Sequence, residues 1–162
     1  MKLYIKQKVF SFRDRFTVKD ECGNDRYFVE GEFLSFGKKL HIYDMNNNEV
    51  AFVRQKLMTF MPKFTVEIGS RQIAEIVKEF TFFKPKYYVD GLGWDVKGDF
   101  FSHDYEIISN GRVIVSIHKQ WMSWGDTFEL DIDNTSDEVV ALAVVLAIDA
   151  VIDAQQASAN NC

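Results

Sequence analysis

The sequence predicts a mainly β domain, a closed antiparallel barrel of about twelve strands wrapped around a buried hydrophobic C-terminal helix. Short segments of alternating apolar and polar residues fill the chain up to residue 132, as expected of strands with one buried face. The segment Asp137–Ala157 reads DEVVALAVVLAIDAVIDAQQA, and every residue from Val139 to Ile148 is apolar. Because its apolar residues fall on all sides, a helix in this segment must be buried all round.

Turn residues separate the alternating segments from one another, and the Asn110-Gly111 pair is the clearest hairpin signal. An aromatic content of 15% also suits sheets. Closely spaced short strands are typical of barrels and sandwiches. The expected strands are Lys2–Lys8, Arg15–Cys22, Arg26–Gly31, Lys38–Met45, Glu49–Lys56, Lys63–Gly69, Gln72–Phe80, Lys86–Val89, Trp94–Phe100, Tyr105–Ser109, Arg112–Gln120 and Thr127–Ile132.

A weak internal repeat suggests two strand units placed end to end. Arg26–Gly31 and Lys86–Gly91 share the pattern basic–aromatic–aromatic–Val–acidic–Gly at an offset of 60. Two further matches follow at offsets of 63 and 64: Val50, Phe52 and Lys56 with Val113, Val115 and Lys119, then Phe60, Phe64, Val66 and Ile68 with Trp124, Phe128, Leu130 and Ile132. Two such units would form one sheet with approximate twofold symmetry, and closing it into a barrel removes the exposed edges.

The final helix is expected over about 135–157. Thr135 and Glu138 fit a capping box, and acidic residues suit the positive end of the helix dipole. Asp149 and Asp153 share one face and are expected where the helix leaves the core and reaches solvent. We expect one domain over residues 1–157 and a frayed tail over 158–162. The predicted core residues of the helix are Val140, Val144, Val145, Leu146 and Ile148.

The net charge of −5 conceals an asymmetry between the two halves of the chain. Residues 1–86 carry 16 Lys and Arg against 11 Asp and Glu, whereas residues 87–162 carry 3 against 13. One interpretation is an anion-binding face opposite an acidic face. The other, which the sequence alone favours, is that strands from both halves interleave and the charges mix in space.

Compartment and membrane topology follow from a few local patterns. The two cysteines, Cys22 and Cys162, are expected to be free thiols in a reducing compartment. The N-terminal residues interleave charges with apolar side chains and contain no signal-peptide core. The uninterrupted apolar run of the last helix is ten residues, against the roughly 20 needed to span a bilayer. We therefore expect a cytoplasmic protein without a transmembrane span. The sequence leaves the oligomeric state open, with a monomer favoured.

Three segments carry a resemblance to a known family. They are MKLYIKQKVFSFRDRFTV at the N-terminus, Tyr27–Gly31, and Lys119–Ile132 with its Lys-x-Trp and Asp-x-Phe-x-Leu patterns before the apolar helix. With these segments the chain resembles the LURP-one-related branch of the tubby C-terminal-like superfamily, including its bacterial YxjI-type members, over essentially its whole length. The resemblance implies a closed barrel around the final helix. Tubby proteins bind phosphoinositides and phospholipid scramblases are more distant relatives, but the resemblance implies no established activity for the bacterial branch.

Enzymatic signatures are weak. His41, His103 and His118 lie in separate strand regions with no metal-ligand spacing around them, so a transition-metal site is not expected. There is no nucleophile elbow, and Cys22 has no neighbouring cation that would strongly activate it. Gly91-Leu92-Gly93 lacks the rest of a phosphate or dinucleotide loop. The sequence implies no cofactor.

A weak calcium candidate precedes the helix. Asp131, Asp133 and Asp137 place oxygens at alternate positions, but the glycine and glutamate of a calcium loop are missing. The resemblance to scramblases, which are thought to bind calcium near this junction, supports the candidate, whereas helix capping explains the same residues without a metal.

Among the candidate functions, anion binding has the most support from the sequence. Basic residues lie next to aromatic residues at or near expected strand ends, and phospholipid headgroups favour such clusters when they converge. The phosphoinositide residues of tubby proteins have no motif match here, and the acidic overall balance argues against nucleic acid. The candidate residues are Arg54, Lys56, Lys63, Lys84 and Lys86.

The sequence thus favours a non-enzymatic cytoplasmic binding or scaffold domain that recognises a phospholipid headgroup or a protein partner on its outer surface. One alternative is a small-molecule enzyme or ligand-binding protein with a pocket at a barrel mouth. In that case two or more perturbed titratable groups should line the pocket. The other alternative is a membrane-anchored domain that uses the C-terminal helix.

Overall fold

The computed structural model describes residues 1–6, 15–32, 37–79, 81–122 and 125–160, and within them it confirms the predicted barrel and helix. Each strand pairs antiparallel with its neighbours in the chain, and β1 pairs with β12 to close the sheet. The strands are β1 Lys2–Lys6, β2 Phe16–Lys19, β3 Asp25–Glu32, β4 Lys39–Asp44, β5 Glu49–Lys56, β6 Lys63–Ile68, β7 Arg71–Glu79, β8 Lys86–Asp90, β9 Trp94–Asp99, β10 Asp104–Ser109, β11 Arg112–Met122 and β12 Gly125–Ile132, followed by the helix α1 Glu138–Asn160.

Alternation along each strand builds the core. In β1 the side chains of Leu3 and Ile5 are buried, and in β5 those of Ala51 and Val53 are buried, while their sequence neighbours face outward. This period of two is the expected one for a sheet with one face on the core. The apolar faces of the strands therefore meet inside the barrel, around α1.

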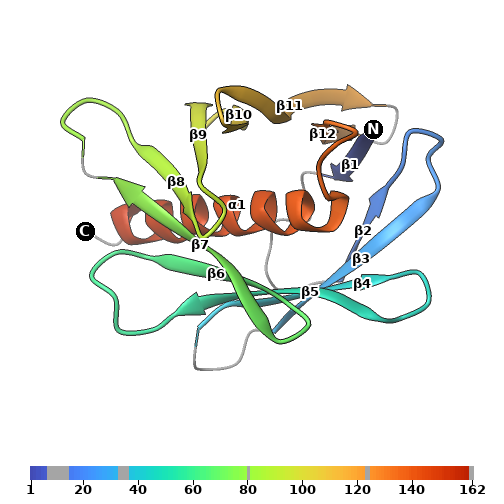
Figure 1. Ribbon diagram of the computed structural model, residues 1–162, viewed down its shortest axis with the longest axis horizontal. Coiled ribbons are helices and arrows are strands. Elements are labelled where there is room, and N and C mark those ends of the chain that lie inside the picture. Colours follow the sequence, from blue (N-terminus) through green and yellow to red (C-terminus); the bar gives the residue numbers. More distant parts are fainter. Residues whose placement is uncertain (7–14, 33–36, 80, 123–124, 161–162) are drawn as a thin grey trace.

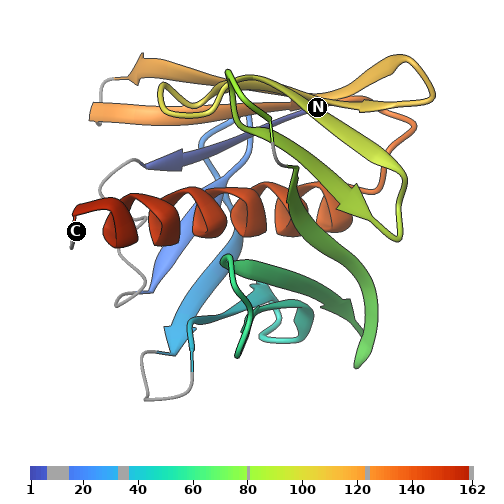
Figure 2. The ribbon, with the colours of Figure 1, turned by 90° about the vertical axis from the view of Figure 1, so that its left-hand side faces the viewer.

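The helix fills the barrel. Figures 1 and 2 show α1 running through the interior with strands on opposite sides of it. Every residue from Ala141 to Ile152 is buried, which confirms the prediction of a helix enclosed all round. Of the five predicted core residues, Val144, Val145, Leu146 and Ile148 are buried, and Val140 is partly buried near the start of the helix.

The helix lies closer to one wall of the barrel than to the other. It approaches β5, β6 and β7 most closely, where the small side chains of Ala51 and Ala74 face inward. The ring of Phe100 contacts those of Tyr87 and Tyr105, with centroids 4.7 and 5.6 Å away, and all three pack into the same core from the region of β8–β10. The small side chains of Ala51 and Ala74 thus leave room for the helix on the β5–β7 side.

The ends of the helix differ from the prediction. Asp137, rather than Thr135, caps the first turn, because its Oδ1 accepts hydrogen bonds from the amides of Val139 and Val140. The Thr135 hydroxyl instead donates to Asp133. The helix continues to Asn160, three residues beyond the expected end, and the Ser158 hydroxyl donates to the carbonyl of Ala154. The last two residues of the expected tail lie outside the described residues.

The sequential strand order gives the barrel two distinct ends and two distinct sides. Because successive strands run in opposite directions, every second connection lies at the same end of the barrel. The described connections β5–β6, β7–β8 and β9–β10 lie at the end where α1 terminates. We call this end the loop end. Strands β1–β7 form one continuous arc and β8–β12 the other. The interpretation that strands of the basic and acidic halves interleave is therefore wrong, and the two halves occupy opposite sides.

The repeat matches fall on strands as follows. In a twelve-stranded barrel a twofold repeat relates strands that are six apart. Two of the matched pairs, β5 with β11 and β6 with β12, have this spacing, whereas the match between Arg26–Gly31 and Lys86–Gly91 joins β3 to β8, five strands apart. Trp124, which the repeat aligned with Phe60, lies outside the described residues.

Candidate functional site

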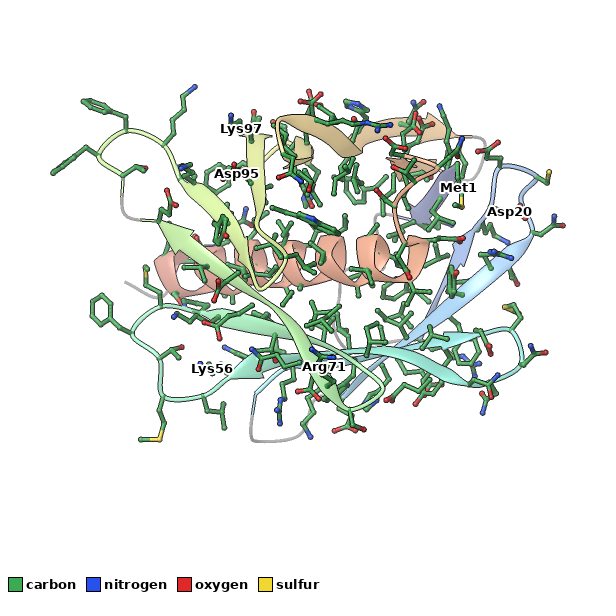
Figure 3. All side chains as sticks on the ribbon, in the orientation of Figure 1. Met1, Asp20, Lys56, Arg71, Asp95 and Lys97 are labelled. Atoms are coloured by element: carbon green, nitrogen blue, oxygen red, sulfur yellow. The ribbon has the colours of Figure 1, made fainter. Side chains whose placement is uncertain are left out.

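Three of the five predicted basic residues converge on the outer face of β5 and β6. Arg54 and Lys56 line a hollow of about 350 Å³ on this face. Lys63 lies directly opposite Lys56 in the register of the two strands. Figure 3 shows Lys56 on the side of the sheet away from α1, near the loop end. We call this hollow the basic hollow, and it is lined by Lys39, Arg54, Gln55, Lys56, Leu57, Thr65 and Gln72.

Carboxylates beneath the cations hold them in place. Glu75 accepts hydrogen bonds from Lys56 at 3.1 Å and from Lys63 at 3.2 Å. Its side chain is 12% exposed, whereas that of Lys56 is 54% exposed. Burial by itself raises the pKa of Glu75, but the two lysine hydrogen bonds outweigh it, so the pKa lies below the ordinary value. The ionised carboxylate therefore lies underneath and the ammonium groups lie outermost.

Arg54 is arranged in the same way. Its Nη2 lies 2.7 Å from Glu67 Oε1, and the side chains are 53% and 15% exposed, respectively. The contact is an ion pair without hydrogen-bond alignment, since within the described part of the chain Glu67 Oε1 accepts no hydrogen bond. A guanidinium has five N–H donors. The pair with Glu67 therefore fixes the side chain and leaves donors directed away from the carboxylate.

The remaining two candidates belong to a neighbouring loop. Lys84 lies in the β7–β8 connection and Lys86 begins β8, where it forms an ion pair with Glu79 at 2.8 Å. The structure thus separates the five predicted residues into a cluster on β5–β6 and a second pair beside the next hairpin loop. Within the five, Arg54, Lys56, Lys63 and Lys86 all have glutamate partners, which reduces the net positive charge of this surface.

A second hollow of about 320 Å³ on the outer face of the barrel, lined in part by residues of β4 and β5, includes His41. The two ring nitrogens of His41 lie 2.6 Å from Glu49 and 2.9 Å from Glu32, and the ring packs against Phe52. Both imidazole nitrogens are therefore occupied by carboxylates. This hollow is acidic at its rim, in contrast to the basic hollow beside it.

The weak calcium candidate gains no support from the geometry. Asp137 caps α1, while Asp133 pairs with Arg112 and accepts from Thr135. Asp131 lies on β12 opposite Lys2. Among the described residues, no three His, Cys, Asp or Glu side chains form a group that could hold a metal ion. The acidic residues at this junction therefore cap the helix and contact neighbouring segments of the chain.

A titratable cluster lies inside the barrel towards the loop end. Asp149 is buried, and its Oδ1 lies 3.2 Å from the Tyr105 hydroxyl, which donates to it, and 3.3 Å from His103 Nδ1. The expectation that Asp149 marks the exit of the helix into solvent is therefore wrong. Burial raises the pKa of Asp149, and its hydrogen bonds with His103 and Tyr105 oppose that shift.

The same cluster extends along the helix to Asp153. Burial, followed by the charge of Asp149, raises the pKa of Asp153 to about 6, and the charges of Lys38 and His103 oppose the shift. Burial lowers the pKa of Lys38 in turn. For His103, burial lowers the pKa, but the hydrogen bond and charge of Asp149 outweigh it and raise the pKa overall. These titratable groups interact with one another where α1 packs against the barrel wall.

The remaining sequence candidates have ordinary surroundings. His118 Nδ1 lies 2.7 Å from Asp104 on the exposed outer surface, and Cys22 is an exposed free thiol. Cys162 lies outside the described residues. Gly91 and Gly93 both have positive φ, as the turn between β8 and β9 requires. Among those that the structure describes, none places a nucleophile beside a base.

The sequence interpretation missed the side chains that protrude at the loop end. Met58 and Phe60 in the β5–β6 connection and Phe82 and Phe83 in the β7–β8 connection are 96% or more exposed. One signal was available: the aromatic pair directly precedes Lys84-Pro85-Lys86 and lies after the expected strand. The other pair gave no such signal, because Phe60 also fitted the internal repeat.

Within the described residues, no helix combines the length and the apolarity that are required to cross a bilayer. The sequence profile of the LURP-one-related family matches residues 1–149. The chain is 34% identical over 152 residues to protein YxjI of Bacillus subtilis (strain 168), covering 94% of each protein. Its fold is similar to that of a protein from Arabidopsis thaliana known from an X-ray structure, with a TM-score of 0.68 and 15% identity over 93% of this chain and 90% of that one. The chain belongs to the LURP-one-related family.

Proposed function

We propose that this protein is a non-enzymatic binding domain that recognises a phosphate-bearing anion, such as the headgroup of an anionic phospholipid, at the basic hollow. The observation that carries the proposal is the layering of charge. Lys56 and Arg54 lie outermost, and Glu75 and Glu67 hold them from beneath. Cations that are fixed before the ligand arrives lose less side-chain entropy on binding.

The neutral groups of the hollow are also suited to an oxyanion. Gln55 and Gln72 contribute amides, and an arginine suits the planar or tetrahedral oxygens of carboxylate and phosphate. The filled barrel supports a binding module over an enzyme with an internal pocket, because α1 occupies the interior in which a substrate would lie. The sequential topology, which keeps the basic half on one side, adds longer-range attraction for an anion.

The test is a titration of the protein with inorganic phosphate and with glycerol phosphate, followed by NMR chemical shifts. The double variant Arg54→Gln/Lys56→Gln is compared with Lys97→Gln, an exposed lysine on β9 in the other arc of the barrel. Hydrogen bonds to charged groups contribute about 1.5–3 kcal/mol each. We therefore expect the double variant to bind at least about ten-fold more weakly, with Lys97→Gln unchanged. Equal affinity in the wild type and the double variant would remove the basic hollow as the site.

A further inference from the structure

The loop end carries large apolar side chains that have no packing partner in the described structure. Met58 and Phe60 protrude from one connection, and Phe82 and Phe83 protrude from the next, with Leu57 half-exposed beside them. We call the first four side chains the loop tips. Isolated exposed apolar residues are normal on a surface, but four large side chains gathered on adjacent hairpins mark an interaction site.

The two hairpins lie at the same end of the barrel. β6 and β7 pair directly, so the β5–β6 and β7–β8 connections are adjacent at this end, with bases about two strand spacings, or roughly 10 Å, apart. Figure 1 shows both loops projecting at the end where α1 terminates. The β7–β8 loop lies above α1 in this view and the β5–β6 loop below it, so a surface that covers this end of the barrel could contact both loops.

Hydrogen bonds within each loop stabilise the loop conformation in which these side chains are exposed. In the first loop, Met58 has a φ of 57° and the Thr59 hydroxyl donates to the Met61 carbonyl at 2.6 Å. In the second loop, the Thr81 hydroxyl donates to the Lys84 carbonyl. A left-handed backbone at a non-glycine residue is uncommon and persists where the surroundings fix it. The exposure of the tips is thus part of the loop conformation.

Lysines surround the tips at the base of each loop. Lys56 and Lys63 flank the first loop, and Lys84 and Lys86 follow the aromatic pair of the second loop, where Lys86 pairs with Glu79 at the end of β7. Apolar side chains next to lysines suit the interface of an anionic bilayer, where the apolar groups enter the acyl boundary and the ammonium groups meet the headgroup phosphates. Protruding tips suit a deformable phase, whereas a protein partner requires a surface of matching shape.

We propose that the loop tips insert into the interfacial region of an anionic phospholipid membrane, and that this insertion brings the basic hollow to the level of the headgroups. The inference rests on the proposed function, because Leu57 borders the first tip and also lines the hollow. Insertion of Met58 and Phe60 would therefore place Arg54 and Lys56 next to lipid phosphates. The tips would supply attachment and the hollow would supply headgroup recognition.

The test is vesicle flotation of the full chain with phosphatidylcholine vesicles that contain or lack phosphatidylglycerol. Two variants, Phe82→Ser/Phe83→Ser and Met58→Ser/Phe60→Ser, are compared with Met45→Ser, an exposed methionine in the β4–β5 connection at the other end of the barrel. We expect each tip variant to bind anionic vesicles at least ten-fold more weakly, while Met45→Ser binds like the wild type. Thermal unfolding midpoints equal to the wild type confirm that the variants fold.

The two proposals fail in different ways. Tip variants that float with anionic vesicles as well as the wild type does, or a wild type that floats with no vesicle, would overturn membrane insertion. In that event, phosphate binding that depends on Arg54 and Lys56 would leave the proposed function standing. Conversely, vesicle binding that requires the tips but is unaffected by Arg54→Gln/Lys56→Gln would support insertion and overturn headgroup recognition at the hollow.

Discussion

Replacing Asp153 with asparagine should stabilise the domain at neutral and alkaline pH and leave its stability unchanged in acid. Asp153 lies on α1 one turn after Asp149, towards the loop end, and burial raises its pKa from 3.8 to about 6. The folded state therefore binds the proton more tightly than the unfolded state does. Stability falls as the pH rises from about 4 to about 6, and above that range the folded protein carries the full cost of a partly buried carboxylate.

The magnitude follows from the size of the shift. One unit of pKa corresponds to about 1.4 kcal/mol, so a shift from 3.8 to about 6 sets an upper limit of about 3 kcal/mol. Asp153 remains partly accessible to solvent, which screens its charge. Asparagine also removes a charge that interacts favourably with Lys38. We therefore expect a gain on the order of 1–2 kcal/mol in the free energy of unfolding at about pH 8.

The measurement is urea unfolding of the wild type and Asp153→Asn between about pH 3.5 and about pH 8, with Glu106→Gln on the exposed face of β10 as the control. The stability difference should grow through the range from about 4 to about 6 and then level off. Asp149 and His103 are present in both proteins, but each interacts with Asp153, so the difference measures the loss of the Asp153 charge together with its interactions in this cluster. A difference that is independent of pH, or a variant less stable than the wild type at about pH 8, would refute the reasoning.

Two further predictions concern the barrel wall and its helix. Gly98→Ala should destabilise the domain by about 2–4 kcal/mol, because Gly98 has a φ of 140° and an added Cβ would lie 2.5 Å from the Asp104 carbonyl oxygen. Gly111→Ala, with positive φ but open space around it, should lose only about 1 kcal/mol; equal losses in thermal unfolding would contradict the clash. Leu146→Asp should abolish folding, since an unpaired charge in a dry core costs several kcal/mol against a typical stability of about 5–15 kcal/mol. Gln156→Glu, on an exposed turn of the same helix, should remain folded by circular dichroism, and a cooperatively folding Leu146→Asp would show that the helix is not central.

Most of the fold could be predicted because its signals are local. Most strands alternate apolar and polar residues with period two, and the boundaries of the described strands agree with the prediction to within a few residues. The burial of α1 followed from an apolar run too broad for one face. The capping residue was assigned wrongly, because both Thr135 and Asp137 are good caps by residue type and only the backbone geometry selects Asp137.

The site was harder to predict because its contacts join distant residues. Asp149 is hydrogen-bonded to Tyr105, 44 residues earlier in the chain. A charged residue in an apolar helix is ordinarily a sign of exposure, and nothing near it in sequence indicated a buried partner. The glutamates beneath Arg54 and Lys56 come from β6 and β7. Only the strand register determines which carboxylate lies under which cation.

The position of the helix is the reason why both proposed sites lie at the surface of the barrel. In an empty barrel the interior is the natural ligand site, but here α1 occupies it with a continuous run of buried residues. The strands leave two kinds of place for new chemistry: their outward-facing side chains, and the loops at either end. The basic hollow is the first kind and the loop tips are the second, and they share the β5–β6 hairpin. In the two proposals, a single hairpin would therefore couple attachment to a membrane with recognition of its phosphates.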